Sequence, residues 1–208
     1  MKEQIIEFLR SEKLKKTDID ELKLVLNVSS SREFKVMIKS VNELLEQAVI
    51  IENSNHEITL IEHTNFMVGR LDLKDRGFGF VIPEDPSLSD VFIPRDYVKD
   101  AMNRDKVLVH VTKKKSGFRQ EGQIKRILDR NYTHVIGVME YRNGMGYLIP
   151  DDKTIKQQVI IKRDNQNGAK KFDVVRAEII NYSFKGKIEC VVSEILGNKN
   201  DAGVDVLS

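Results

Sequence analysis

The sequence predicts an α+β chain, with an N-terminal helical domain followed by two tandem five-stranded β-barrels. Three observations lead to this class. Apolar residues recur at helical spacing in the first quarter of the chain, and from residue 66 they alternate with polar residues, as strands require. The alternating segment is then repeated at an offset of 67–68 residues. We therefore expect domains at 1–64, 65–131 and 132–197.

The first 64 residues predict three helices and a short hairpin. An apolar stripe across 5–9 indicates the first helix. Thr17 is the expected N-cap of a second helix, and the serines at 29–31 begin a third, longer one. The apolar segments 49–51 and 58–60 flank a polar turn and predict the hairpin.

Three helices followed by a hairpin are typical of a winged helix-turn-helix domain, whose usual role is to bind duplex DNA. Residues 1–64 nevertheless carry 9 basic and 12 acidic residues, a net charge of −3, which opposes binding to phosphates. We favour a structural role or a protein partner for this acidic domain. Weak nucleic-acid contact stays open, because Lys35 and Lys39 share one face of the third helix.

The segment 66–130 predicts five short strands separated by turn signals rich in Gly, Pro, Asp and Ser. Five strands in about 65 residues suit an OB-type barrel. The expected strands are 66–73, 78–83, 90–94, 106–112 and 121–128.

Three phenylalanines form the principal candidate site. Phe78 and Phe80 lie two residues apart and share one face of a strand, and Phe92 lies on the next strand. Core packing is the competing interpretation, since Phe is usually buried. The alternate positions Gly79 and Val81 suit a barrel interior, which favours phenylalanines on the outside. Exposed aromatic residues in a row form a stacking platform for unpaired bases.

Basic residues coincide with this aromatic segment. Residues 65–132 hold 14 basic and 10 acidic residues, a net charge of +4, whereas residues 133–208 have a net charge of +1. Lysine and arginine supply the sequence-independent part of nucleic-acid affinity. A solvated surface is the ordinary alternative for each of them. The candidate phosphate contacts are Lys74, Arg76, Arg70, Arg95 and the loop run Lys113, Lys114 and Lys115.

The second barrel repeats the landmarks of the first with a weaker platform. It carries Met145 and Ile160 where the first copy has Phe78 and Phe92, so we expect it to stack bases less well. Its candidate contacts, for which structural packing is the competing interpretation, are Tyr141, Arg142, Tyr147, Lys162 and Arg163. The matched landmarks are Val68-Gly69 with Ile136-Gly137, Gly77–Phe80 with Gly144–Tyr147, Val81–Pro83 with Leu148–Pro150, Val91–Ile93 with Val159–Ile161, and Asp105–Val107 with Asp173–Val175.

Nothing in the sequence predicts a catalytic or metal site. The acidic pairs 84–85 and 151–152 lie in matching turns, which explain them without chemistry, and the four histidines show no ligand spacing. No apolar run is long enough to cross a membrane, the N-terminus does not resemble a signal peptide, and Cys190 is the only cysteine. These features favour the cytoplasm.

The residues 77–81 and 91–93 resemble the two ribonucleoprotein motifs of cold-shock domains. The order of winged helix, cold-shock-like barrel and second barrel resembles the N-terminal region of the bacterial ribonuclease R family, which are RNB-type 3′→5′ exoribonucleases. The tail 198–208 is similar to the start of the linker into that family's catalytic domain. The chain departs from free cold-shock proteins at Leu73 and Pro94, which implies a smaller platform.

The resemblance implies a function in RNA degradation. The chain would recruit single-stranded RNA and guide its 3′ end to a catalytic domain in cis. That domain would hold the aspartate cluster and its Mg²⁺, so the chain by itself is expected to need no cofactor and to be inactive. The alternative is a freestanding nucleic-acid chaperone or regulator whose winged helix reads DNA.

Overall fold

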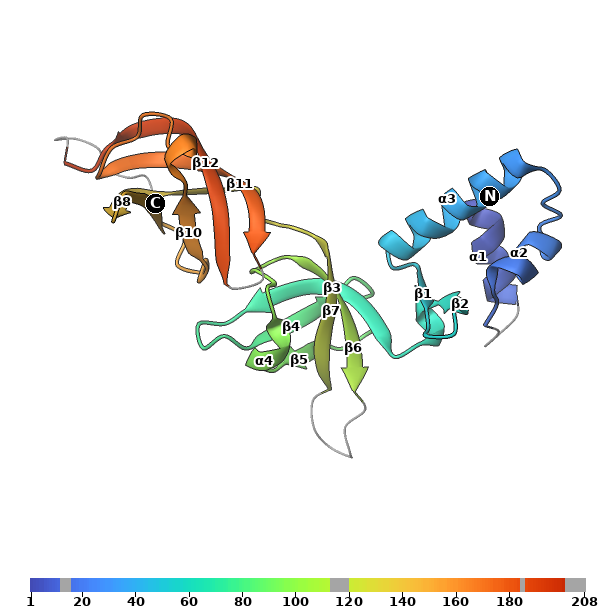
Figure 1. The fold of residues 1–208 in the computed structure, drawn as a ribbon. Helices are drawn as coiled ribbons and strands as arrows, with labels where there is room; N and C mark the ends of the chain where they lie inside the picture. Colours follow the sequence, from blue (N-terminus) through green and yellow to red (C-terminus); the bar gives the residue numbers. More distant parts are fainter. Residues whose placement is uncertain (12–15, 113–119, 184–185, 201–208) are drawn as a thin grey trace. The chain divides into compact units, whose positions relative to one another are not determined.

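The computed structural model describes residues 1–11, 16–112, 120–183 and 186–200 (Figure 1). Two compact units divide the chain: one comprises 1–70, 81–93 and 106–128, and the other comprises 71–80, 94–105 and the chain from 129 onward. The secondary structure consists of a helical domain and two closed five-stranded barrels, which confirms the predicted α+β class with two OB-type barrels. None of the helices in the described ranges is long and apolar enough to cross a bilayer.

The helical domain follows the predicted order of three helices and a hairpin. Its core contains Ile5, Leu22, Met37 and Leu44, all at most 2% exposed. Its elements are α1 (Lys2–Ser11), α2 (Ile19–Val25), α3 (Ser31–Glu46), β1 (Ile50–Glu52) and β2 (Ile58–Leu60), and β1 pairs antiparallel with β2.

The predicted N-cap of the second helix is wrong by one residue. The carboxylate of Asp18 accepts the backbone N–H of Glu21 at 2.8 Å and so caps α2. Thr17 is instead buried in a bridge with Ile58, in which each backbone N–H donates to the other residue's carbonyl, at 3.1 and 2.7 Å. This pairing lies about 40 residues away in sequence, so helix-start signals do not reveal it.

The two barrels have the same strand order. The first is closed in the order β3-β4-β5-β7-β6, and the second, in the matching order β8-β9-β10-β12-β11, repeats it strand for strand. This identity confirms the predicted duplication. The strands are β3 (Phe66–Leu73), β4 (Gly79–Pro83), β5 (Val91–Ile93), β6 (Lys106–Thr112), β7 (Glu121–Asp129), β8 (His134–Arg142), β9 (Met145–Pro150), β10 (Gln158–Ile161), β11 (Asp173–Ser183) and β12 (Lys187–Asn198).

Short helical turns connect the helical domain to the first barrel and connect strands within each barrel. A 3₁₀ turn, η1 (Ile61–His63), links β2 to β3. Each barrel also has a helical turn between its third and fourth strands, α4 (Arg95–Val98) in the first and η2 (Arg163–Asn165) in the second. These turns cannot be predicted from hydrophobic periodicity, because three or four residues are too few for a periodic signal.

Matched glycines allow the first two strands of each barrel to approach closely. A Cβ atom on Gly69 would lie 2.3 Å from the carbonyl oxygen of Ile82 in β4. In the second barrel a Cβ atom on Gly137 would lie 2.1 Å from the carbonyl oxygen of Ile149. Both obstacles are backbone atoms, which cannot rotate away, so only glycine fits.

We predict that Gly69→Ala destabilises the chain by about 2–3 kcal/mol, because β3 and β4 must separate to admit the methyl group. The control is Gly144→Ala, where no atom lies within 4 Å but φ is +76°, so the cost should be about 1 kcal/mol. Urea unfolding measures both. Equal losses would contradict the close approach as the reason for glycine at position 69.

Cys190 provides an independent probe of the second barrel. Its thiol lies in the barrel core with no exposed surface, and burial raises its pKa to about 12. Because the reactive thiolate is then scarce at pH 8, we predict negligible reaction with a disulfide reagent in the native state and full reaction in urea. Rapid labelling without denaturant would contradict this packing.

Candidate nucleic-acid interface

The three candidate phenylalanines lie on the outer face of the first barrel. Phe78, Phe80 and Phe92 are each half-buried, whereas the alternate positions Val81 and Val91 have no exposed surface. The rings of Phe78 and Phe80 meet edge to face, with centroids 6.0 Å apart and planes at 86°. We call these three residues the aromatic row.

A tight turn brings the basic residues to the end of this row. The N–H of Lys74 donates to the carbonyl of Phe78 at 2.8 Å, and the N–H of Gly77 donates to the carbonyl of Lys74 at 2.9 Å. The ammonium group of Lys74 forms an ion pair with the carboxylate of Asp72 at 2.5 Å. A phosphate that uses Lys74 must therefore compete with a carboxylate.

Arg95 is brought to the same turn from α4. A Cβ atom on Gly77, whose φ is +85°, would lie 3.2 Å from Cγ and 3.3 Å from Nε of Arg95. The missing side chain thus gives the turn its left-handed conformation and lets the arginine lie against it. Arg76 and Arg95, which are 19 positions apart in the sequence, consequently flank one glycine.

The remaining basic candidates of the first barrel lie elsewhere. Arg70 is exposed on β3, in register with Lys106 of β6, whose ammonium group pairs with Glu84 at 2.8 Å. The run 113–115 lies outside the described residues. The structure therefore groups Lys74, Arg76 and Arg95 with the aromatic row and leaves Arg70 on a separate strand position.

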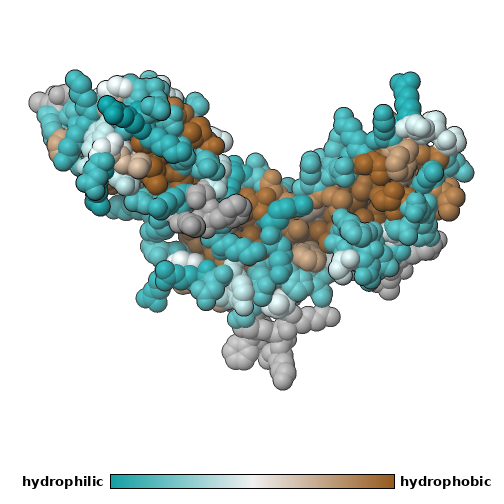
Figure 2. Space-filling view, in the orientation of Figure 1, coloured by the Kyte–Doolittle hydropathy of each residue, from teal (hydrophilic) through white to brown (hydrophobic). Residues whose placement is uncertain are grey.

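The second barrel has a different surface at the matching place. Tyr147 is half-buried on the outer face of β9, in register with Glu140 on one side and Ile160 on the other. Met145 and Ile149 flank it on the same strand and are 41% and 55% exposed. Apolar side chains accordingly reach the surface of this barrel (Figure 2).

Two of the other candidates of the second barrel, Tyr141 and Lys162, make contacts within the barrel's own structure. The hydroxyl of Tyr141 donates to the carbonyl of Ala169 at 2.6 Å, and burial raises its pKa. Lys162 pairs with Glu189 at 2.8 Å. Arg142 and Arg163 are exposed, on β8 and η2 respectively. These contacts are more compatible with packing than with a second aromatic row.

A buried aspartate, predicted from the sequence only as a landmark of the repeat, fixes the connection that carries Arg95. Asp105 has no exposed surface and accepts hydrogen bonds from the backbone N–H groups of Met102 at 2.8 Å and Asn131 at 2.9 Å. The guanidinium of Arg130 also donates to it at 2.9 Å. Burial raises the pKa of Asp105, and these three donors oppose the rise.

The second barrel repeats this arrangement with a neutral partner. Asp173 accepts the N–H of Lys170 at 2.7 Å and the amide of Asn198 at 2.8 Å. The preceding residues, Arg104 and Phe172, both adopt positive φ, of 65° and 70°. Each third-to-fourth strand connection therefore ends in the same turn, and the recurrence of Asp at the same offset was the signal available in the sequence.

The described residues bring together no group of three or more His, Cys, Asp or Glu side chains that could hold a metal ion.

Comparison with known proteins agrees with this architecture. Residues 69–127 match the ribonuclease B OB domain, and residues 147–208 match a cold shock domain. Ribonuclease R of Thermotoga maritima is 27% identical over 209 residues, which cover 100% of this chain and 29% of that protein. Ribonuclease R 2 of Lactococcus lactis is 33% identical over 156 residues, which cover 64% of this chain and 22% of that protein.

Solved structures share the fold. The apo form of Mycoplasma genitalium RNase R aligns with a TM-score of 0.57 at 18% identity, over 65% of this chain and 22% of that one. The yeast pseudonuclease Ssd1 aligns with a TM-score of 0.53 at 16% identity, over 68% of this chain and 24% of that one. These structures show that the fold is shared, and the family matches identify a ribonuclease B OB domain and a cold shock domain within the chain.

The chain therefore resembles the N-terminal region of the ribonuclease R family, whose curated members match along its whole length. It spans less than a third of the length of the curated relatives, 29% for the Thermotoga protein and 27% for a Lactococcus one.

We predict that Asp105→Ala costs about 3–5 kcal/mol of stability, because it leaves Arg130 and two backbone N–H groups without their acceptor. Asp173→Ala, whose side-chain partner is the neutral Asn198, should cost about 1–3 kcal/mol. Urea unfolding compares the two. If the losses are the same, the charge of Arg130 adds nothing to the turn.

Proposed function

We propose that this chain is an RNA-binding module that captures single-stranded RNA and guides its 3′ end toward a catalytic domain in cis. The observation that carries the proposal is the aromatic row, three half-buried phenylalanines on the outer face of the first barrel, next to a turn with three cations. Base stacking on aromatic side chains contributes about 1–3 kcal/mol per base and tolerates any sequence.

The relatives support this proposal. They carry the name ribonuclease R, and the Mycoplasma genitalium RNase R, whose fold matches, has also been solved in complex with ribose-methylated single-stranded RNA. In our proposal the cations supply salt-dependent capture, the aromatic row holds the bases, and the second barrel adds weaker contact through Tyr147. Metal-assisted hydrolysis would belong to the catalytic domain, and the cytoplasm stays the expected compartment.

Titration of labelled oligo-U tests the aromatic row. We predict that Phe80→Ala or Phe78→Ala weakens binding about tenfold, since each removes one stacking surface. Raising the salt concentration should lower the affinity of the wild type, with a slope of about −0.7 for each neutralised phosphate.

The control variant is Ile82→Ala, which removes a 49% exposed apolar side chain from the same strand outside the aromatic row. It should bind oligo-U as the wild type does. Absence of binding at low salt, or phenylalanine variants that behave like Ile82→Ala, would refute the proposal. A preference for duplex DNA over oligo-U would favour a DNA-reading winged helix instead.

A further inference from the structure

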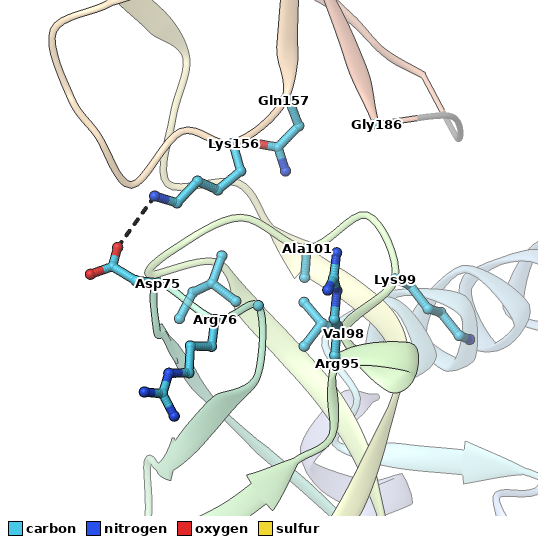
Figure 3. A pocket seen from close by; sticks show the side chains of 11 residues that line it. Asp75, Arg76, Arg95, Val98, Lys99, Ala101, Lys156, Gln157 and Gly186 are labelled. Carbon is cyan, nitrogen blue, oxygen red and sulfur yellow. Dashed lines mark hydrogen bonds and ion pairs between the residues drawn. The ribbon is translucent and has the colours of Figure 1, made fainter.

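The second compact unit contains an open cavity of about 540 Å³ beside the turn that precedes the aromatic row. This volume is in the range of sites for small ligands. Its floor is apolar and includes Val98 and Ala101, which are 5% and 1% exposed. The polar side chains that line it are Asp75, Arg76, Arg95, Lys99, Lys156 and Gln157 (Figure 3).

The lining of the cavity is strongly basic. Four cations and a single carboxylate line it, and the carboxylate, that of Asp75, pairs with Lys156 at 3.2 Å. The side chains of this pair are 91% and 48% exposed, so the ion pair contributes little and can be exchanged for another anion. A cavity with this excess of positive charge is suited to an anion such as a phosphate.

Two polar groups converge inside the cavity. Figure 3 shows the Arg95 guanidinium pointing from α4 toward the amide of Gln157, while Lys156 points away toward Asp75. The Oε1 atom of Gln157 is buried and has no hydrogen-bond partner among the described residues. A buried polar atom without a partner costs about 1–3 kcal/mol, so a ligand that pairs with this amide would recover that cost.

The chemistry of the two groups identifies the ligand class. A guanidinium binds phosphate through paired N–H donors. An amide can donate through its nitrogen or accept through its oxygen, and a ribose 2′-hydroxyl can meet either, because it is both donor and acceptor. Arg95 and Gln157 together therefore match the phosphate and the 2′-hydroxyl of one ribonucleotide unit.

We propose that this cavity binds one ribose-phosphate unit of an RNA strand and lets the chain distinguish RNA from DNA. In this arrangement Arg95 holds the phosphodiester, Lys99 and Lys156 add positive charge, and Gln157 pairs with the 2′-hydroxyl. The inference rests on the proposed function, since the strand that occupies the cavity is the one stacked on the aromatic row, which begins two residues after Arg76.

The test compares labelled oligo-U with oligo-dU, which differs from it only by the absence of the 2′-hydroxyl. The wild type should prefer oligo-U. Gln157→Leu should weaken oligo-U binding about threefold to tenfold and leave oligo-dU unchanged, which removes the preference. The control is Gln158→Leu, an exposed neighbour that does not line the cavity, and it should keep the preference.

Charge variants test the phosphate contact in both directions. Arg95→Gln should weaken the binding of both oligonucleotides about tenfold and reduce the slope of log affinity against log salt concentration by about 0.7. Arg95→Lys should keep this slope but still lower the affinity. Asp75→Asn should strengthen the binding of both oligo-U and oligo-dU, because it releases Lys156 from its ion pair. Matched controls are Arg176→Gln and Asp164→Asn, which are exposed residues outside the cavity and should bind as the wild type does.

The outcomes separate this inference from the proposed function. If the wild type does not bind oligo-U, the proposed function fails first. If Phe80→Ala weakens binding while Arg95→Gln and Gln157→Leu behave like their controls, the aromatic row stands and the cavity proposal is overturned. Displacement of oligo-U by uridine monophosphate at comparable concentration would likewise overturn it, in favour of a free-nucleotide site.

Discussion

Closure of a barrel from only five strands is the constraint on which the rest of this chain depends. Such a small barrel brings its first two strands so close that there is no space for a side chain at positions 69 and 137, where each barrel has glycine. The alternate apolar residues of the strands fill its interior. Binding groups are therefore confined to the outward positions and to the connections between strands. Both the aromatic row and the basic cavity are found there.

The two barrels share their strand order but carry different groups at matching positions. Between the first two strands the first barrel has a longer turn that carries Asp75 and Arg76, whereas the second has the two-residue turn Asn143-Gly144, with φ of 52° and 76°. The shorter turn has no position from which a side chain could line a cavity of the same kind. The two copies thus share a core and a buried aspartate but differ in the groups available to a ligand.

The sequence predicted the fold well because its determinants are local. Strand alternation, glycines and the repeat offset are visible in the residues themselves, and the strand bounds predicted for the first barrel agree within one position. The Asp18 cap has a local signal in Asp18 and Glu21, but the distant pairing of Thr17 with Ile58, which occupies the residue expected to cap the helix, has none. The cavity was missed for the same reason: Lys99 and Gln157 come from separate connections, and neither has a neighbour in the sequence that marks it.

In the proposed function, the ion pairs on the first barrel limit the affinity that an RNA strand can gain there. Lys74 pairs with Asp72 and Lys106 with Glu84, so a count of cations overstates the charge available to a phosphate. Exposed pairs of this kind contribute about 0–1 kcal/mol, less than a charge-assisted bond to a phosphate returns. They therefore lower the net attraction without blocking the site. A surface of this type favours strands that also stack on the aromatic row over polyanions that offer charge alone.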